Sequence, residues 1–364
     1  MSSITPQTAT VIGQPPPPAR TGGTWDVVRG SKILWPILAL AGILLFNLIY
    51  DYRFFAIRMN EGHLDGNLIN VLKNGSAVML LSLGMTMVIA TAGIDLSVGS
   101  VMAIAGAMAG VLIARPDYAQ LSSINVHGSL LLILFFALGA SMLLGVANGL
   151  LVALLDIQPI VATLVMMIAG RGIAELITNG QRPTFDTIMP ASFGFIGRGF
   201  FLWLPFPITI ALGMALITGL LTRGTALGLF LESIGNNATA SRYAGVNARV
   251  MKIVAYIWCA LCAGMAGLIG TSNLAYSDVN KLGLNMELDA ILAAAIGGAS
   301  LAGGRFSLAG SLIGALVIQS LTTTIASLGV SSDVSMVVKA GVVVLVCLLQ
   351  SEKFRLKVTS LVRS

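Results

Sequence analysis

An aspartate lies between two long apolar runs, and this arrangement limits the folds open to the chain. The runs are Ala77–Ala90 and Val98–Ile113, and Asp95 sits in the sequence TAGIDLSVG at 91–99 that joins them. Moving a carboxylate from water into a bilayer costs several kcal/mol, so it needs a partner or a purpose there. Glycines on both sides of it can interrupt helices, and interrupted helices beside a polar residue form substrate paths in membrane transporters. The feature therefore predicts a transport protein.

Composition supports a membrane protein. The chain is 56% hydrophobic and 10% charged, with a mean hydropathy of +0.91, whereas about 25% of the residues of a soluble domain are charged. The apolar runs are continuous rather than alternating, which favours helices over membrane strands. We therefore expect an all-α, polytopic membrane protein.

The length of the chain leaves room for about ten membrane spans of about 20 residues each. They are expected at 33–50, 75–92, 96–114, 129–155, 159–178, 203–222, 250–272, 286–300, 306–328 and 332–350. With ten spans and a cytoplasmic N-terminus, Lys and Arg are more frequent in the inside segments, as the positive-inside rule requires. Both termini are therefore predicted to be cytoplasmic.

Three parts follow from this reading. Residues 1–32 are polar, contain a run of prolines at 15–18 and are predicted to be a disordered cytoplasmic tail. Residues 33–350 form the predicted transmembrane domain, with a cytoplasmic loop at 223–249, and 351–364 form a cytoplasmic C-terminal tail.

Several common motifs are missing from the sequence. No G-x-x-x-x-G-K-[ST] phosphate loop occurs, and the only histidines are His63 and His127, both in predicted outside loops. We therefore expect no metal site and no cofactor in this chain. If ATP drives transport, another polypeptide must hydrolyse it. No basic run interleaves with aromatic residues, so nucleic acid is not an expected partner.

The longest predicted cytoplasmic loop, Arg223–Arg249, offers a place for such a polypeptide to dock. Leu227, Phe230 and Ile234 fall at near-helical spacing, which predicts a short amphipathic helix at about 228–245. Glycines 235 and 245 are expected to set the turns at its ends. On pattern alone, an ordinary solvated loop is the alternative.

Four ordered motifs resemble one protein family. They are SLGMTMVIATAGIDLSVG at 82–99, QPIVATL at 158–164 with GRG at 170–172, the E-S-I-G…N…A…AGVN pattern at 232–247, and the LDAI…IGG…S…GGR pattern at 288–305. The chain thereby resembles, over residues 35–350, the permease subunits of bacterial ABC importers for monosaccharides, the ribose, xylose and galactose family. Within that family it is most similar to the galactofuranose permease. Phe306 stands where many members have Gly.

The resemblance implies a type II-like ABC importer permease in the bacterial inner membrane. It implies a second permease subunit, identical or homologous, two ATPase subunits that bind ATP and Mg, and a periplasmic sugar-binding protein. The loop helix would be the coupling helix, with Glu232 pairing with the ATPase and Gly235 allowing a close backbone approach. The expected contacts are Leu231, Glu232, Ser233, Ile234, Gly235, Asn236, Asn237, Ala240, Arg242 and Gly245.

A path for a neutral sugar needs hydrogen-bonding side chains at bilayer depth. The candidates by position are Asp95, Asn148, Thr163, Glu175, Asn179, Asn273, Asp289 and Thr322–Thr324. For each of them, a hydrogen bond between helices is an equally serious interpretation, and Asp95 and Asp289 could cap broken helices. Arg171 and Glu175 stand four residues apart and are expected to form an ion pair.

Other functional classes remain open at this point. An ion-coupled secondary sugar carrier would use Asp95 or Glu175 to bind a proton or Na⁺. A branched-chain amino acid ABC permease has a related fold. An integral-membrane enzyme or scaffold is a further alternative, but this sequence contains no nucleophile–base pair and no set of metal ligands at the membrane surface that would support it. The sugar itself, and the choice between a homodimer and a heterodimer, are also open.

Overall fold

The computed structural model describes residues 33–60, 62–114, 129–330 and 332–350, and within them the protein is a bundle of helices. The predicted tails at 1–32 and 351–364 lie outside the described residues. The helices are α2 (Leu34–Tyr50), the short 3-10 helix η1 (Tyr52–Phe55), α3 (Asn67–Ala90), α4 (Val98–Ile113), α5 (Leu130–Ala153), α6 (Pro159–Ile177), α7 (Ala191–Arg198), α8 (Phe206–Arg223), α9 (Leu227–Asn236), α10 (Ala238–Tyr243), α11 (Ala248–Leu274), α12 (Met286–Ile296), α13 (Leu308–Ser327) and α14 (Ser332–Gln350). Two antiparallel hairpins, β1 (Arg58–Asn60) with β2 (His63–Asp65) and β3 (Phe200–Phe201) with β4 (Leu204–Pro205), complete the described chain.

Each predicted span overlaps one of these helices. By length and apolar composition, α3, α5, α6, α8, α11 and α13 can cross a membrane, and α2 and α4 are shorter apolar helices. The all-α membrane class is thereby confirmed. Helix α3 begins at Asn67, eight residues before the predicted start at 75. The prediction began too late because the first turns carry the polar residues Asn67, Asn70 and Lys73, and a search for continuous apolar residues leaves them out. Helix α7 and both hairpins were not predicted.

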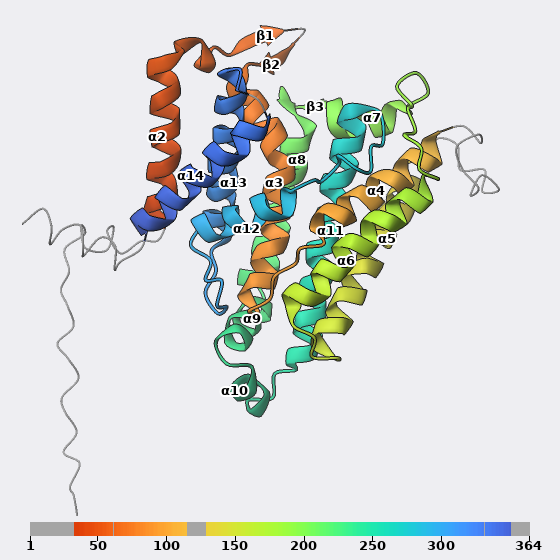
Figure 1. Ribbon diagram of the computed structural model, residues 1–364, viewed down its shortest axis with the longest axis vertical. Helices are drawn as coiled ribbons and strands as arrows, with labels where there is room; N and C mark the ends of the chain where they lie inside the picture. The colour runs from red at the N-terminus through yellow and green to blue at the C-terminus, as the bar shows by residue number, and fades with distance from the viewer. Residues whose placement is uncertain (1–32, 61, 115–128, 331, 351–364) are drawn as a thin grey trace, which may run out of the picture.

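The ends of the bundle differ in character. Both hairpins and α7 lie at one end, and α9 and α10 lie at the other (Figure 1). The first residue of α2 and the last residue of α14 both lie at the ends of these two helices that point away from the hairpins (Figure 1). The two ends of the described chain therefore lie on one side, and the assignment of that side to the cytoplasm rests on the Lys and Arg pattern.

Two helices of the bundle are short because a non-helical segment precedes each of them. Residues 91–97 lead from α3 into α4, and residues 275–285 lead from α11 into α12. The second segment lies along α4, since a Cβ on Gly110 would meet the Ser277 side chain and one on Gly106 would meet the Leu282 side chain. Glycine in α4 therefore leaves the space that this segment occupies.

The beginnings of α4 and α12 meet in the interior. A Cβ on Gly99 would collide with the Gly283 carbonyl oxygen and would lie 2.6 Å from Glu287 Oε2. Each helix begins with backbone N–H groups that lack a partner within the helix. The fold thus brings two helix N-termini and two non-helical segments to one place. Interrupted helices of this kind were predicted from the sequence at 91–99, and they are typical of membrane transporters.

Helix α11 forms the centre of the packing. Its Tyr256, Cys259 and Cys262 are fully buried, and the two cysteines are free thiols. Gly145 and Gly149 of α5 lie against α11, where a Cβ on Gly149 would be 2.8 Å from the Ile253 Cα. The G-x-x-x-G spacing therefore brings these two backbones into contact.

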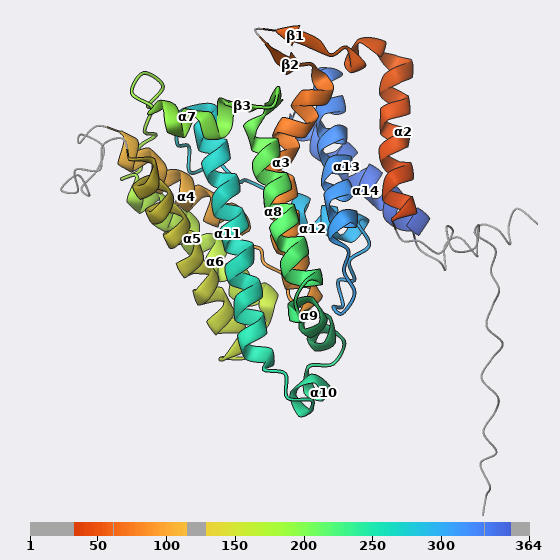
Figure 2. The same ribbon diagram turned by 180° about the vertical axis from the view of Figure 1, so that it is seen from behind.

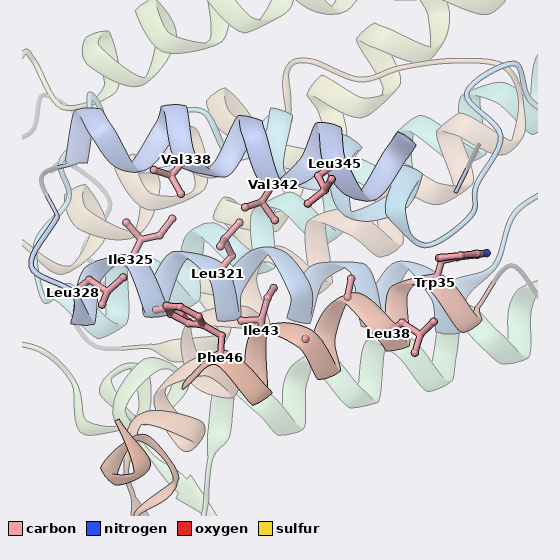
Figure 3. Close-up of a pocket in the computed structure, with 13 residues that line it drawn as sticks. Trp35, Leu38, Ile43, Phe46, Leu321, Ile325, Leu328, Val338, Val342 and Leu345 are labelled. Carbon is pink, nitrogen blue, oxygen red and sulfur yellow. The ribbon is translucent and has the colours of Figure 1, made fainter. Parts of the chain in front are cut away.

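Helix α2 stands partly apart from the rest. Between it, α13 and α14 lies an apolar groove of about 570 Å³, lined by side chains such as Leu38, Phe46 and Val342 (Figure 3). At one point α2 is held by Asn47, whose Nδ2 donates to Thr324 Oγ1 at 2.7 Å. A buried amide in an apolar setting needs such a partner. Thr324, one of the path candidates, therefore joins two helices in this conformation.

Candidate functional site

A polar cluster surrounds Asp95 at the point where the chain turns into α4. Asp95 is completely buried, and its Oδ1 accepts hydrogen bonds from Ser97 N at 2.9 Å and Ser97 Oγ at 2.6 Å. Asn148 of α5 donates through Nδ2 to Ser97 Oγ at 2.7 Å and to Asp95 Oδ1 at 3.4 Å. The structure thus brings two of the predicted path residues into contact.

A third predicted residue holds the same segment. Thr163 of α6 is fully buried, and its hydroxyl contacts the Pro159 carbonyl at 2.8 Å and the Ile94 carbonyl at 3.3 Å. Tyr256 of α11 also lies near that Ile94 carbonyl, at 3.4 Å. Residues 91–97 are thereby tied to three helices, which compensates for the hydrogen bonds that a helix would have formed.

Two oxygen atoms in this cluster are not fully paired. Asp95 Oδ2 and Asn148 Oδ1 are buried and have no nitrogen or oxygen donor among the described residues, although the Cys259 thiol lies beside the Asp95 carboxyl. Both are acceptors, and leaving a buried acceptor unpaired costs about 1–3 kcal/mol. The cluster can therefore accept a further hydroxyl or amide donor, but in this conformation it is closed to solvent.

The expected Arg171–Glu175 pair is not among the ion pairs of the described residues. Arg171 donates instead to the carbonyl oxygens of Val279 and Leu282 at 2.5 and 2.6 Å. These carbonyls belong to a non-helical segment and need donors, and a guanidinium can supply two at once. Glu175 is exposed, as is Asn179.

Glu287 is a buried acid that sequence reasoning missed. It lies in the first turn of α12, is 9% exposed and faces Gly99 at the beginning of α4. Arg171 is also close enough to interact with its carboxylate. A carboxylate at helix N-termini is electrostatically favourable. The signal that could have found it is an acid in the first turn of a short apolar helix, two residues before Asp289.

Asp289 pairs with a cation on the last helix. Lys339 Nζ of α14 lies 3.1 Å from Asp289 Oδ1 and 3.0 Å from Oδ2, and each side chain is 19% exposed. The pair joins α12 to α14, both expected to lie at membrane depth. Thr322 of α13 contacts the carbonyl of Ile318 in its own helix, at 2.8 Å.

Asn273 lines a small cavity near the hairpin end. The cavity has a volume of about 130 Å³ and is bordered by Lys73 and Asn74 of α3, by Asn273 of α11 and by Met286 of α12. This volume is below the range of about 300–1,000 Å³ that is usual for ligand pockets. The cavity brings polar groups of α3 and α11 together next to the beginning of α12.

At the opposite end, the predicted loop helix is two helices. The single helix expected at about 228–245 is interrupted at Asn237, whose backbone is extended and whose side chain caps α10 by accepting from Ala240 N at 2.9 Å. Asn is a preferred helix N-cap, which explains the break. In α9, Leu231 and Ile234 are buried, so this helix packs into the bundle.

Gly235 makes its close approach inside the chain. A Cβ there would overlap the Ala90 carbonyl oxygen and the backbone of Gly304, and Gly304 N donates to that same Ala90 oxygen at 3.0 Å. Its expected contact with the ATPase stays a prediction. Within the chain, this glycine brings α9 against the end of α3 and the segment that follows α12.

The other expected contacts divide between buried and exposed positions. Glu232 lies 3.8 Å from Arg223, and Ser233 donates to the Phe230 carbonyl at 2.9 Å. The exposed ones are Asn236, Asn237, Ala240, Arg242 and Gly245. Tyr243, which was not predicted, is 90% exposed. The accessible surface of the loop is thus formed mainly by α10.

Comparison with known proteins connects this arrangement to one family. Residues 67–347 match the family described as branched-chain amino acid transport system / permease component. The chain is 44% identical over 329 residues to the galactofuranose transporter permease protein YtfT of Escherichia coli (strain K12), covering 89% of this chain and 92% of that one. It is 38% identical over 326 residues to the fructose import permease protein FruF of Bifidobacterium longum (strain NCC 2705), covering 89% and 88%.

A third relative is the ribose import permease protein RbsC of Escherichia coli (strain K12), 38% identical over 288 residues, or 79% of this chain and 86% of that one. No solved structure matches the chain. The resemblance read from the four sequence motifs is confirmed by these relatives.

Proposed function

The chain belongs to the family of branched-chain amino acid transport system / permease components, and from this premise we propose that it is the membrane permease subunit of an ATP-driven monosaccharide importer. The observation that carries the proposal is the similarity, over most of the chain, to permeases named for galactofuranose, fructose and ribose. The same relatives favour a sugar over a branched-chain amino acid as substrate.

The partners follow from what the chain lacks. It has no phosphate loop, so ATP and Mg belong to separate ATPase subunits, and the exposed surface of α10 is the proposed place of contact. A sugar-binding protein would deliver the substrate to the hairpin end. The multi-pass fold belongs, on this proposal, in the inner membrane of a bacterium.

The sugar path is proposed to run along the exposed side of α6 and the segment before α12. Glu175 and Asn179 are exposed there, as are Asn280, Lys281 and Asn285. Lipid chains cannot solvate such groups, which supports a water-filled path completed by a second permease subunit. The closed cluster of Asp95, Asn148 and Thr163 would hold the broken helix α4 beside this path.

An ion-coupled carrier is the weaker candidate. Of the two acids proposed for its proton or Na⁺ site, Asp95 is completely buried and only Glu175 is exposed. The relatives named above are import permeases rather than ion-coupled carriers.

The experiment is purification of the tagged chain from its native membranes, followed by reconstitution into vesicles and measurement of uptake of labelled galactofuranose, ribose and fructose. We expect a stoichiometric phosphate-loop ATPase in the preparation and uptake that requires ATP and a binding protein. Uptake driven by an ion gradient without ATP would overturn the proposal.

A further inference from the structure

A polar groove opens beside α10. It has a volume of about 620 Å³ and lies between α10, the end of α5 and the beginning of α11. Its side chains include Asp156, Arg242, Tyr243, Arg249 and Lys252. Helix α10 lies beyond the ends of the bundle helices in both views (Figures 1 and 2), so the groove lies at this end of the molecule.

The groove is positively charged and its cations are not neutralised within the described chain. Three cationic side chains, Arg242, Arg249 and Lys252, share it with one carboxylate, Asp156. None of the three cations belongs to an ion pair among the described residues. A concave surface lined by one sign of charge concentrates the field and attracts a partner of the opposite sign.

A neighbouring arginine on the same end of the molecule shows the contrast. Arg223 lies 3.8 Å from Glu232 and its guanidinium stands over the Phe306 ring at 5.2 Å. Both contacts keep it within the fold. Within the described part of the chain, the cations of the groove form neither an ion pair nor a contact with an aromatic ring of this kind.

The side chains at the rim are of the kind that dominates protein interfaces. Tyr243 is 90% exposed and follows Arg242 on α10, and Tyr and Arg are enriched among the residues that carry binding energy. A tyrosine with so much surface in water gains free energy when a partner covers it. The groove and its rim therefore suit a protein partner better than a free ion.

We propose that this groove binds an acidic segment of the ATPase subunit, with carboxylates of that segment facing Arg242, Arg249 and Lys252. The proposal rests on the proposed function and adds a receiving surface on the permease to the contact made by α10. An anionic lipid headgroup would satisfy the same cations, and the experiments below separate the two.

The first experiment is carbodiimide crosslinking of the whole complex purified from membranes, because this reagent joins a lysine amine to a carboxylate that it touches. Lys252 is the lysine of the groove. We expect a peptide that joins Lys252 to an Asp or Glu of the ATPase, and its loss in Lys252→Arg, which keeps the charge. If the ATPase is present and Lys252 couples only to Asp156 or to nothing, the inference is wrong. If no ATPase accompanies the chain, the proposed function fails first.

The second experiment measures ATPase binding to the permease in nanodiscs. Arg242→Glu and Arg249→Glu should each weaken binding about tenfold at low salt, because like charges would then face each other. Arg58→Glu, on an exposed residue at the hairpin end, makes the same change of charge away from the groove and should leave binding unchanged. Equal effects of all three variants would refute the inference. So would an effect that appears only with anionic lipid, since that outcome assigns the groove to a headgroup.

Discussion

Lys339 of α14 and Asp289 of α12 form a two-oxygen ion pair, with the ammonium nitrogen 3.0 and 3.1 Å from the carboxylate oxygens. Both side chains are 19% exposed. Val338, Val342 and Leu345 of α14 line the apolar groove shared with α2 and α13, and the ion pair adds a polar contact between α14 and the short helix α12. A charge left alone at such a place is far more costly than the pair is stabilising.

Breaking this pair on one side should therefore destabilise the protein. Asp289→Asn leaves the Lys339 ammonium unpaired, and we expect a loss of about 3 kcal/mol of stability. The double variant Asp289→Asn with Lys339→Met removes both charges and should recover most of that loss. Thermal unfolding of the detergent-solubilised protein measures both. A double variant as unstable as the single one would show that the pair itself, rather than the unpaired charge, matters.

The contact between Gly235 and Ala90 leads to a second prediction. Gly235→Ala places a methyl group on the Ala90 carbonyl oxygen and the Gly304 backbone, so α9 must shift, at a cost of about 1–3 kcal/mol. We expect lower thermal stability together with weaker ATP-driven uptake. Gly219→Ala in α8, where a Cβ meets nothing within 4 Å, is the matched control. Unchanged stability of Gly235→Ala would contradict the packing described for α9.

How far the sequence alone leads can be seen from particular residues. The apolar runs predict nearly every long helix, because burial in a bilayer demands continuous apolar segments. The break around Asp95 was also expected from its charge and its glycines. Arg171, in contrast, has partners 108 and 111 residues away, and i, i+4 spacing suggested Glu175 instead. Such pairings depend on how helices meet.

Gly235 illustrates the same limit. The resemblance to the permease family implies a close backbone approach at this residue, and the structure has one within the chain. Which backbone approaches it is decided by tertiary packing, which here brings Ala90 and Gly304 together from distant parts of the chain. Glu287 was overlooked because its neighbour Asp289 belongs to the recognisable motif.

Because Glu175 forms no ion pair with Arg171 among the described residues, its role can be tested separately, and this is the third prediction. Glu175→Leu removes an exposed polar group from the proposed path, so it should leave thermal stability unchanged and slow sugar uptake about tenfold, the equivalent of one charge-assisted hydrogen bond. Leu176→Ala, at an 81% exposed neighbour, should change neither quantity. If Glu175→Leu transports normally, the path does not follow this side of α6.

Unlike the change at Glu175, a change at Arg171 should lower the stability of the protein. Arg171→Met keeps much of the length of the side chain but removes the Nη1 donor of both hydrogen bonds to the carbonyls of Val279 and Leu282. We expect a loss of about 2 kcal/mol of stability, and faster hydrogen exchange in 275–285 than elsewhere in the bundle. Thermal unfolding and hydrogen–deuterium exchange with mass spectrometry provide the two readouts. Uniform exchange across the chain would mean that the arginine does not hold this segment.

The closed cluster around Asp95 gives the last prediction. Its Asn148 side chain is the amide that donates a hydrogen bond to Ser97 Oγ. Asn148→Asp has nearly the same shape but replaces the amide that donates to Ser97 Oγ at 2.7 Å with a second buried acid next to Asp95. The hydrogen bond is lost and two carboxyl groups share one site, so at neutral pH we expect a loss of at least about 2 kcal/mol. That loss should shrink as the pH falls, since a protonated carboxyl can again donate to a neighbouring oxygen. Asn280→Asp, at an exposed position, controls for the change of net charge and should show no such pH dependence. Thermal unfolding between pH 5 and 8 measures the difference, and parallel curves for the two variants would mean that Asn148 does not hold the segment that leads into α4.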